Sequence, residues 1–172
     1  MSDTPVRTHI MAQDRWWPFQ EYMIRSGGKD AVQDVDFRGA RNARPTPEAV
    51  DALATADAIV IGPSNPIISI APILALPGFR EAIMDSKAPV VAVSPFVGGQ
   101  VIKGPTAAFM DWTGRPLTTD GIAQSYDQLI DGVIADQRAT ALPTLETDVM
   151  MDTDQSRRQV AEDTLRFALA LG

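Results

Sequence analysis

The chain has 172 residues, of which 45% are hydrophobic, and its formal net charge is −7. This length and hydrophobic content suffice for a sizeable core and argue against disorder. The negative charge argues against a nucleic-acid partner, because duplex binding relies on clustered Lys and Arg. The sequence contains no cysteine, which excludes disulfides, thiolate nucleophiles and Cys-ligated metals.

Neither end of the chain nor its interior carries a recognisable targeting or membrane signal. The N-terminal MSDTPVRTHI lacks an apolar core of signal-peptide length, and no run approaches the roughly 18 apolar residues of a membrane span. We therefore expect a soluble cytoplasmic protein with no membrane partner. The single histidine, His9, excludes a Ser-His-Asp triad and a multi-histidine metal site.

Short β-rich runs alternate with helical patterns in the first part of the chain. Strands are predicted at 6–12, 32–37 and 57–62, with helices at 18–26, ending at Gly27-Gly28, and from Thr46 onward. Thr46 is predicted to be the N-cap of that second helix and Pro47 its first residue. Its inward face is predicted to hold Val50, Leu53 and Ala54.

The remaining elements continue the same rhythm. They are a helical pattern over 70–86 interrupted at Pro77-Gly78, a strand at 89–94, a helix at 105–113, strand-like segments at 132–136 and 145–151, and a closing helix over 153–171. In the closing helix the residues expected near the core are Val160, Leu165, Phe167, Ala168 and Leu169. The alternation predicts a single α/β domain with a mostly parallel, Rossmann-like sheet flanked by helices in three layers.

Two loops follow the strands at 57–62 and 89–94. The first is Gly62-Pro63-Ser64-Asn65-Pro66, and the second is SPFVGGQVIKGPT, from Ser94 to Thr106. Glycine lets the backbone approach a ligand, and ligands of open parallel sheets sit at the carboxyl ends of strands, so the loops predict a phosphate or nucleotide site. Neither loop is a Walker A or dinucleotide motif. The alternative to a phosphate site is that the glycines only permit tight turns.

Other polar and aromatic residues allow a functional and a structural interpretation. The acidic stretch with Asp148, Asp152 and Asp154 suits a hard cation, but Asp152 and Thr153 lie where a helix N-cap is expected. Two further sets of side chains have two interpretations each, ligand binding or an ordinary place in a core, an interface or a solvated loop. They are the aromatic residues Trp16, Trp17, Phe19 and Tyr22, and the basic residues Arg38, Arg41 and Arg44.

The string GPSNPIISIAPILALPGFREAI followed by APVVAVSPFVGGQVIKGPT resembles the central signature of the 2-phospho-L-lactate transferase family. VRTHI, FQEYMIR and the closing LETDVMMDTDQSRRQVAEDTLRFAL extend the resemblance over nearly the whole chain. A looser version of the signature occurs in the related gluconeogenesis-factor proteins, but SNP and VGG-x-x-x-KGP favour the transferase.

The resemblance implies a step in making coenzyme F420. Family members transfer a phospholactyl or phosphoenolpyruvyl group from a guanosine diphosphate-linked donor to an 8-hydroxy-5-deazaflavin acceptor and release GMP, commonly with Mg²⁺ on the phosphates. The residues expected to hold the donor and its phosphates are Gly62, Pro63, Ser64, Asn65, Ser69, Gly98, Gly99, Lys103 and Gly104. Ser69 is alternatively an ordinary helix N-cap before Ile70, and Lys103 a solvated lysine.

Complete family members begin with a GG-x-GG loop and an N-T-G-D-D segment, and neither occurs here. The chain therefore resembles the C-terminal half alone, and the Mg²⁺ ligands are expected outside it. Three function classes follow: a transferase, a non-catalytic nucleotide-sugar-binding regulator, and a half-enzyme that needs an N-terminal-half polypeptide. A sheet edge exposed in such a half also favours a homodimer.

Overall fold

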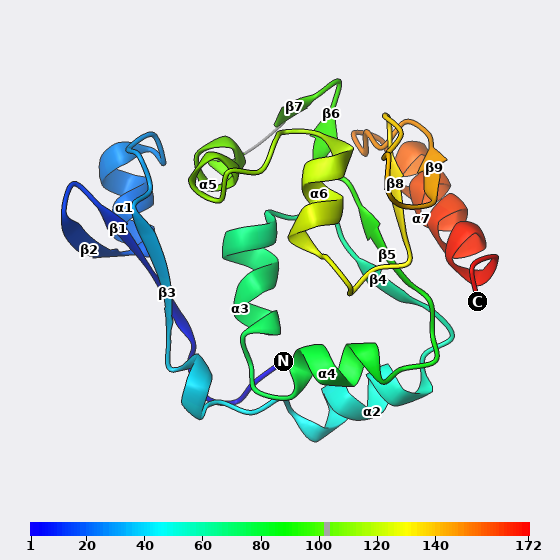
Figure 1. Cartoon of the computed structure of the whole chain (residues 1–172), viewed down its shortest axis with the longest axis horizontal. Coiled ribbons are helices and arrows are strands. Elements are labelled where there is room, and N and C mark those ends of the chain that lie inside the picture. The colour runs from blue at the N-terminus through cyan, green and yellow to red at the C-terminus, as the bar shows by residue number, and fades with distance from the viewer. Residues whose placement is uncertain (102–103) are drawn as a thin grey trace.

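A computed structural model describes residues 1–101 and 104–172 (Figure 1). The first half contains β1 (Arg7–Ala12), β2 (Arg15–Pro18), α1 (Phe19–Ser26), β3 (Asp34–Arg38), η1 (Ala40–Asn42), α2 (Pro47–Thr55), β4 (Ile59–Ile61), η2 (Pro66–Ile70), α3 (Ala71–Leu74) and α4 (Phe79–Met84). The second half contains β5 (Val90–Val93), β6 (Phe96–Val97), β7 (Gln100–Val101), α5 (Thr106–Trp112), α6 (Thr119–Ser125), β8 (Gly132–Ala135), β9 (Thr144–Glu146) and α7 (Asp154–Leu169).

The centre of the fold is a four-stranded parallel sheet in the order β4-β5-β8-β9. Side chains on alternate residues of the strands enter two separate cores. Val90 and Ala92 pack with Ile122 of α6 on one face, whereas Val91 and Val93 pack with α7 on the other. This α/β arrangement of a parallel sheet between helices confirms the predicted fold class.

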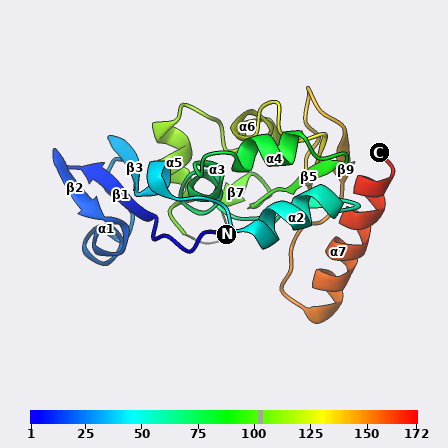
Figure 2. The same ribbon diagram turned by 90° about the horizontal axis from the view of Figure 1, so that it is seen from below.

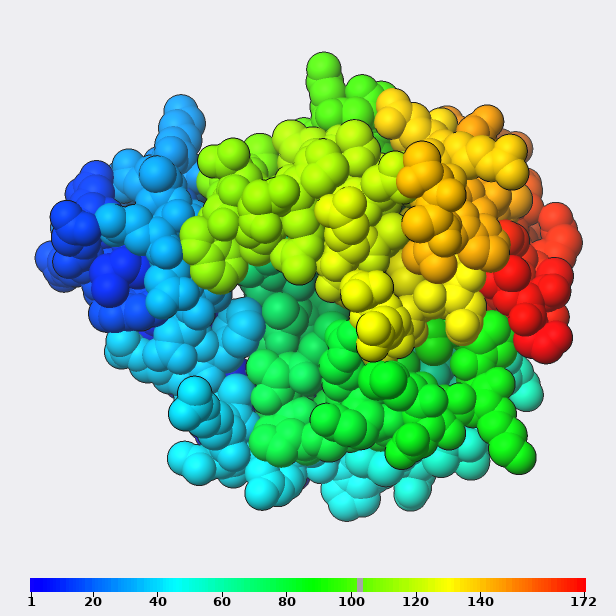
Figure 3. Space-filling view, in the orientation of Figure 1, coloured from blue at the N-terminus to red at the C-terminus, as the bar shows by residue number. Residues whose placement is uncertain are grey.

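The first strands do not join the parallel sheet. β1 pairs antiparallel with both β2 and β3 in a three-stranded sheet, which Figures 1 and 3 place at the opposite end of the long axis from α7. The strand β2 was not predicted, because its turn with β1 uses Gln13 and Asp14 at positive φ and no glycine marks it.

Helix termini follow the predicted caps closely. The Thr46 hydroxyl accepts the Ala49 N–H at the start of α2, and Thr153 forms a capping box with Ser156 at the start of α7. α1 ends at Gly27, which adopts the left-handed conformation. Among the described residues, no helix is long and apolar enough to cross a membrane.

Two predicted inward faces were right only in part. In α2, Val50 and Ala54 are exposed, while Ala49 and Leu53 pack on the core beside α4. In α7, Val160 and Ala168 are buried as predicted, but Leu165 and Leu169 face solvent. Each helix packs with one flank only, α2 beside α4 and α7 on the sheet, so fewer of its apolar residues are buried than its sequence suggests.

The predicted strand over 145–151 is also too long. Pairing with β8 ends at Glu146, and the chain then runs as a loop to Thr153. Val149 in this loop is buried against the core beneath α7. Because the segment is apolar without being paired, its composition alone suggested a strand. Figure 2 shows α7 following this loop at one end of the molecule.

Candidate functional site

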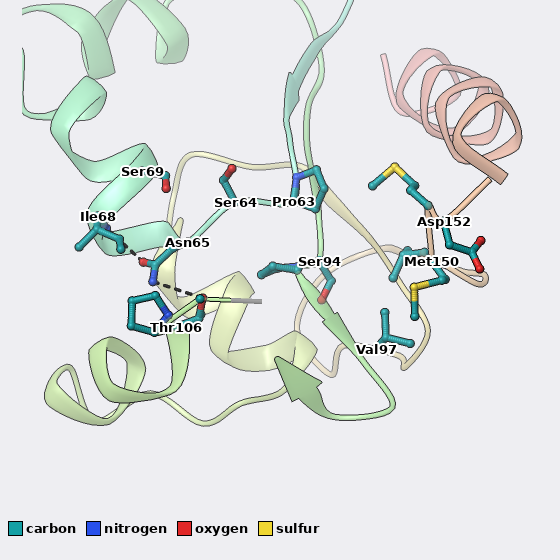
Figure 4. A pocket seen from close by; sticks show the side chains of 15 residues that line it. Pro63, Ser64, Asn65, Ile68, Ser69, Ser94, Val97, Thr106, Met150 and Asp152 are labelled. Atoms are coloured by element: carbon teal, nitrogen blue, oxygen red, sulfur yellow. Dashed lines mark hydrogen bonds between the residues drawn. The ribbon is translucent and has the colours of Figure 1, made fainter. Parts of the chain in front are cut away.

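A cavity of about 490 Å³ opens at the carboxyl ends of β4 and β5 (Figure 4). Four segments that are distant in the sequence converge on it: the loop after β4, the loop after β5, the start of α5 and the loop before α7. The lining residues are Pro63, Ser64, Asn65, Ile68, Ser69, Ser94, Pro95, Val97, Gly104, Pro105, Thr106, Val149, Met150, Met151 and Asp152. The predicted convergence of the two loops is therefore found in the structure.

Asn65 holds two of these segments together. Its Oδ1 accepts the backbone N–H groups of Ile67 (2.8 Å) and Ile68 (3.1 Å), and its Nδ2 donates to Thr106 Oγ1 at 3.3 Å. Asn65 and Thr106 are both buried. The Asn65 side chain, predicted to hold the donor, is thus occupied by contacts within the protein and shapes the cavity wall.

The two candidate serines, Ser64 and Ser69, both line the cavity. Ser64 N–H donates to the Gly62 carbonyl at 2.7 Å, which leaves the Ser64 hydroxyl as its group available to the cavity. Ser69 does not cap a helix, because the chain already winds as the π-helical turn η2 from Pro66 and Asn65 is its N-cap. Ser69 is exposed and lines the cavity, so its hydroxyl is available to a ligand.

The glycines of the second loop have different positions. Gly98 and Gly99, with φ of 60° and 70°, form the two-residue turn between β6 and β7, where Val97 pairs with Gln100. Neither lines the cavity, and the Gly98 N–H donates to the Asp136 carboxylate. Gly104 does line the cavity. Lys103 lies outside the described residues.

Several lining residues were not among those expected to hold the donor. Ser94 is buried, with its N–H on the Ile134 carbonyl (2.8 Å) and its Oγ accepting the Phe96 N–H (3.1 Å). Met150 and Asp152, from the loop before α7, form the opposite wall in Figure 4. Ser94 directly follows a buried strand, which is a usable sequence signal, whereas no local pattern points to Met150.

Charge in the cavity is sparse. Among the lining residues that the structure describes, Asp152 is the only charged one. Among these described lining residues, the groups that could donate to a phosphate are hydroxyls and N–H groups. In residues 1–101 and 104–172 no three His, Asp or Glu side chains gather as metal ligands.

The three aspartates of the acidic stretch have separate local partners. Asp148 accepts the Met150 N–H, Asp152 accepts the Ser156 hydroxyl, and Asp154 pairs with Arg157. The single carboxylate that reaches the cavity does not make a Mg²⁺ site. The described residues therefore do not fit that cofactor by themselves.

The remaining candidates lie apart from the cavity. Burial raises the pKa of Tyr22, whose hydroxyl donates to the Asp30 carbonyl at 2.7 Å. Arg15 stacks on Trp17, whose indole N–H donates to the Ala12 carbonyl, and Arg38 lies over Trp16 and pairs with Asp36. Two further residues make backbone contacts: Arg44 donates to the Ala43 carbonyl, and His9 Nδ1 lies 3.2 Å from the Arg7 carbonyl.

The parallel sheet defines an α/β protein, and the cavity lies at its carboxyl edge, where sheets of this kind bind ligands. Comparison with known proteins gives the family. The family model of the 2-phospho-L-lactate transferase CofD matches residues 1–168, and this chain belongs to that family.

Transferases from three organisms are similar to this chain. The chain is 39% identical to the 2-phospho-L-lactate transferase of Halobacterium salinarum, over 94% of this chain and 48% of that protein. It is 34% identical to the 2-phospho-L-lactate transferase of Methanosarcina mazei and 36% to the phosphoenolpyruvate transferase of Kitasatospora aureofaciens, each over 94% of this chain and 56% of the relative. The chain thus spans about half the length of these relatives.

A solved structure supports the fold. A Bacillus halodurans protein matches with a TM-score of 0.59 at 17% identity, over 93% of this chain and 58% of that one. At this identity the match concerns the architecture alone.

Proposed function

We propose that this chain forms the donor-binding part of a transferase of coenzyme F420 biosynthesis. The donor is a guanosine diphosphate linked to lactate or enolpyruvate, and the acceptor is the terminal hydroxyl of an 8-hydroxy-5-deazaflavin riboside-like compound. The observation that carries this proposal is the cavity at the carboxyl ends of β4 and β5, in a chain of the CofD family. Its volume, about 490 Å³, is within the range of small-molecule sites.

The reaction requires positioning more than a covalent nucleophile. The acceptor hydroxyl oxygen forms a bond to the phosphorus that carries the lactyl or enolpyruvyl group, the bond from that phosphorus to the GMP oxygen breaks, and the hydroxyl proton is released. Such phosphoryl-type transfers depend on alignment and charge neutralisation. Mg²⁺ would supply that neutralisation, with ligands from beyond the residues described here.

Within this chain we assign the polar contacts to Ser64 and Ser69. Both line the cavity, and neither hydroxyl has a hydrogen-bond partner among the described residues. Asn65 and Thr106 hold the wall between them in place. Asp152 disfavours a bare phosphate on its side of the cavity, so the diphosphate is expected nearer the serines.

The other half of the relatives' length is needed for turnover under this proposal. The described residues lack a metal-ligand group, and the chain spans about half of each relative. The isolated chain is therefore expected to bind the guanylyl end of the donor and to transfer nothing.

A thermal-shift titration tests donor binding. GMP and GDP are expected to raise the melting temperature of the chain, since a ligand at 100 times its Kd adds about 2.7 kcal/mol of stability. Ser69→Ala should reduce the shift, whereas Thr55→Ala, an exposed change on α2 outside the cavity lining, should leave it intact. A response to uridine diphosphate sugars and none to guanosine nucleotides would instead support the regulator and overturn the proposal.

A further inference from the structure

A second cavity, of about 460 Å³, lies between α6, the turn that follows it and residues 140–142 before β9. It shares no lining residue with the cavity at the carboxyl ends of β4 and β5. Its volume is also within the range of small-molecule sites. The two cavities are therefore separate, and the second has no part in the proposed donor binding.

One face of α6, continued by the turn after it, forms a wall of this second cavity. Asp120, Ala123, Gln124 and Asp127 all line it. Residues at intervals of three, four and seven lie on the same side of a helix. With a rise of about 1.5 Å per residue, Asp120 and Asp127 are about 10 Å apart along the helix direction. This wall therefore has a carboxylate at its start and another at its end.

No cation of the described chain neutralises the two carboxylates. The ion pairs found in residues 1–101 and 104–172 involve other residues, and the lining of this cavity includes no Lys, Arg or His. Asp120 Oδ1 accepts the Thr140 N–H (2.7 Å) and hydroxyl (3.1 Å), which leaves Asp120 Oδ2 available. Arg80 of α4 donates to the Asp127 backbone carbonyl and not to its carboxylate. The cavity is therefore negatively charged and favours a cation.

The Tyr126 hydroxyl is a further polar group of this cavity. Tyr126 is only 2% exposed and lines the cavity, and no hydrogen bond joins its hydroxyl to another described residue. Of the side-chain N and O atoms that the described residues enclose completely, only Thr164 Oγ1 lacks a partner. The Tyr126 hydroxyl is therefore not enclosed but opens to the cavity, where its oxygen can accept a hydrogen bond from a ligand.

Apolar side chains line the cavity beside these polar groups. Ala123 lies on the α6 wall between the two aspartates, and Ile130 and Leu142 also contribute to the lining. Ala123 and Ile130 are buried, and Leu142 packs against the core. An aliphatic chain that covers these groups removes further apolar surface from water.

From this arrangement we propose that the second cavity binds a linear aliphatic polyamine, with one ammonium group at Asp120 and another at Asp127. An ammonium group has three N–H donors and no acceptor, so it can donate to a carboxylate and to the Tyr126 hydroxyl oxygen together. The alkyl chain between the ammonium groups lies over Ala123. A nucleotide or an organic acid is disfavoured here, because its negative charge would meet two aspartates.

Calorimetric titration with cadaverine and spermidine, in nucleotide-free buffer of low ionic strength, tests this inference. Saturable one-to-one binding is expected, and added salt should weaken it because screening reduces the attraction. Pentylamine, which has the same alkyl chain as cadaverine but one ammonium group, should bind at least about tenfold more weakly. Ser69→Ala should leave the polyamine affinity unchanged, so a failure of donor binding and a failure of this inference are distinguishable.

Variants locate the bound polyamine. Asp120→Asn and Asp127→Asn should each weaken cadaverine binding at least about fivefold, and Tyr126→Phe at least about twofold. Asp85→Asn removes the same charge from an exposed position outside the cavity and is the matched control. Asp127 is exposed as well, so Asp127→Asn should leave the melting temperature of the free chain unchanged.

Three results would overturn the inference. One is the absence of saturable binding by both polyamines. Another is an equal loss of affinity in Asp127→Asn and Asp85→Asn, which would mean that the polyamine is attracted only by the net negative charge of the chain. The third is binding of pentylamine as tight as that of cadaverine, because a ligand held at one end does not need both aspartates.

Discussion

The Asn65 amide donates to Thr106 Oγ1 at 3.3 Å and so joins the loop after β4 to the start of α5, 41 residues further along the chain. The same side chain caps η2 through the N–H groups of Ile67 and Ile68. One buried asparagine thus fixes both the helical turn behind the cavity and the distance between two of its walls.

Replacement of Asn65 should therefore cost stability. Asn65→Ala removes the cap and leaves Thr106 unpartnered, and we expect a loss of about 1–2 kcal/mol in the free energy of unfolding. Asn65→Asp keeps an oxygen for the Ile67 and Ile68 N–H groups and should lose less. Urea unfolding followed by circular dichroism measures both. Equal losses in the two variants would show that the cap contributes nothing.

Ser69 should behave in the opposite way. It is exposed and is not a cap, so Ser69→Ala is expected to leave the free energy of unfolding within about 0.5 kcal/mol of the original. Donor affinity should fall by a factor of about 2 to 10, the effect of one neutral hydrogen bond. Calorimetric titration with GDP, beside chemical denaturation, separates the two effects. If Ser69→Ala destabilised the protein and left its GDP affinity normal, the role of Ser69 would be structural.

The glycine turn should matter for stability alone. Gly98 and Gly99 have positive φ at the turn between β6 and β7, and neither lines the cavity. Gly98→Ala and Gly99→Ala are each expected to cost about 1 kcal/mol, the penalty for a left-handed alanine. GDP affinity should be unchanged in both. A loss of GDP affinity without a loss of stability would indicate that these glycines belong to the phosphate site.

These cases show which features a sequence reveals. Thr46 and Thr153 were identified as caps because a cap depends on a few adjacent residues. The buried flank of α7 was identified in part: Phe167 packs on the core as predicted, whereas Leu165 is exposed, because the neighbouring strands decide which apolar side chains are covered. Local sequence signals therefore predict the elements and their ends, whereas tertiary packing decides which face of each helix is buried.

The residues of the candidate site also differ in whether local sequence signals predict their positions. Pro63, Ser64 and Gly104, which were predicted to hold the donor, line the cavity, and each lies in a loop next to an element that the sequence marks. Gly98 and Gly99 were placed at the phosphate, although Gly-Gly between residues able to pair is also a hairpin signal. The wall at Met150 depends on where the loop before α7 folds back, and no nearby residue encodes that contact.

Asp152 should oppose anion binding in this cavity. It is the charged side chain among the described lining residues, and its exposed carboxylate repels a phosphate. In metal-free buffer of low ionic strength, Asp152→Asn is expected to tighten GDP binding by a few-fold, with the gain reduced at high salt because screening weakens the repulsion. Asp85→Asn, outside the cavity lining, is the matched control. Weaker binding by Asp152→Asn in metal-free buffer would mean that the carboxylate contacts the ligand as an acceptor.

Tyr126 should make the protein sensitive to alkali. It is buried, and that burial raises the pKa of its hydroxyl above the usual value near 10. The folded chain then holds this proton more tightly than the unfolded chain does. Stability is consequently unaffected by this group below pH 10 and falls as the pH rises above 10, by up to about 1.4 kcal/mol per pH unit.

Tyr126→Phe removes that titration without removing the ring. No hydrogen bond joins the Tyr126 hydroxyl to another residue in the described ranges 1–101 and 104–172, so the variant should match the original protein near pH 8. Above pH 10 its free energy of unfolding should decline less steeply. Urea unfolding at a series of pH values from 8 to about 11 gives both slopes, which would be parallel if Tyr126 ionised equally easily in the folded and unfolded chains.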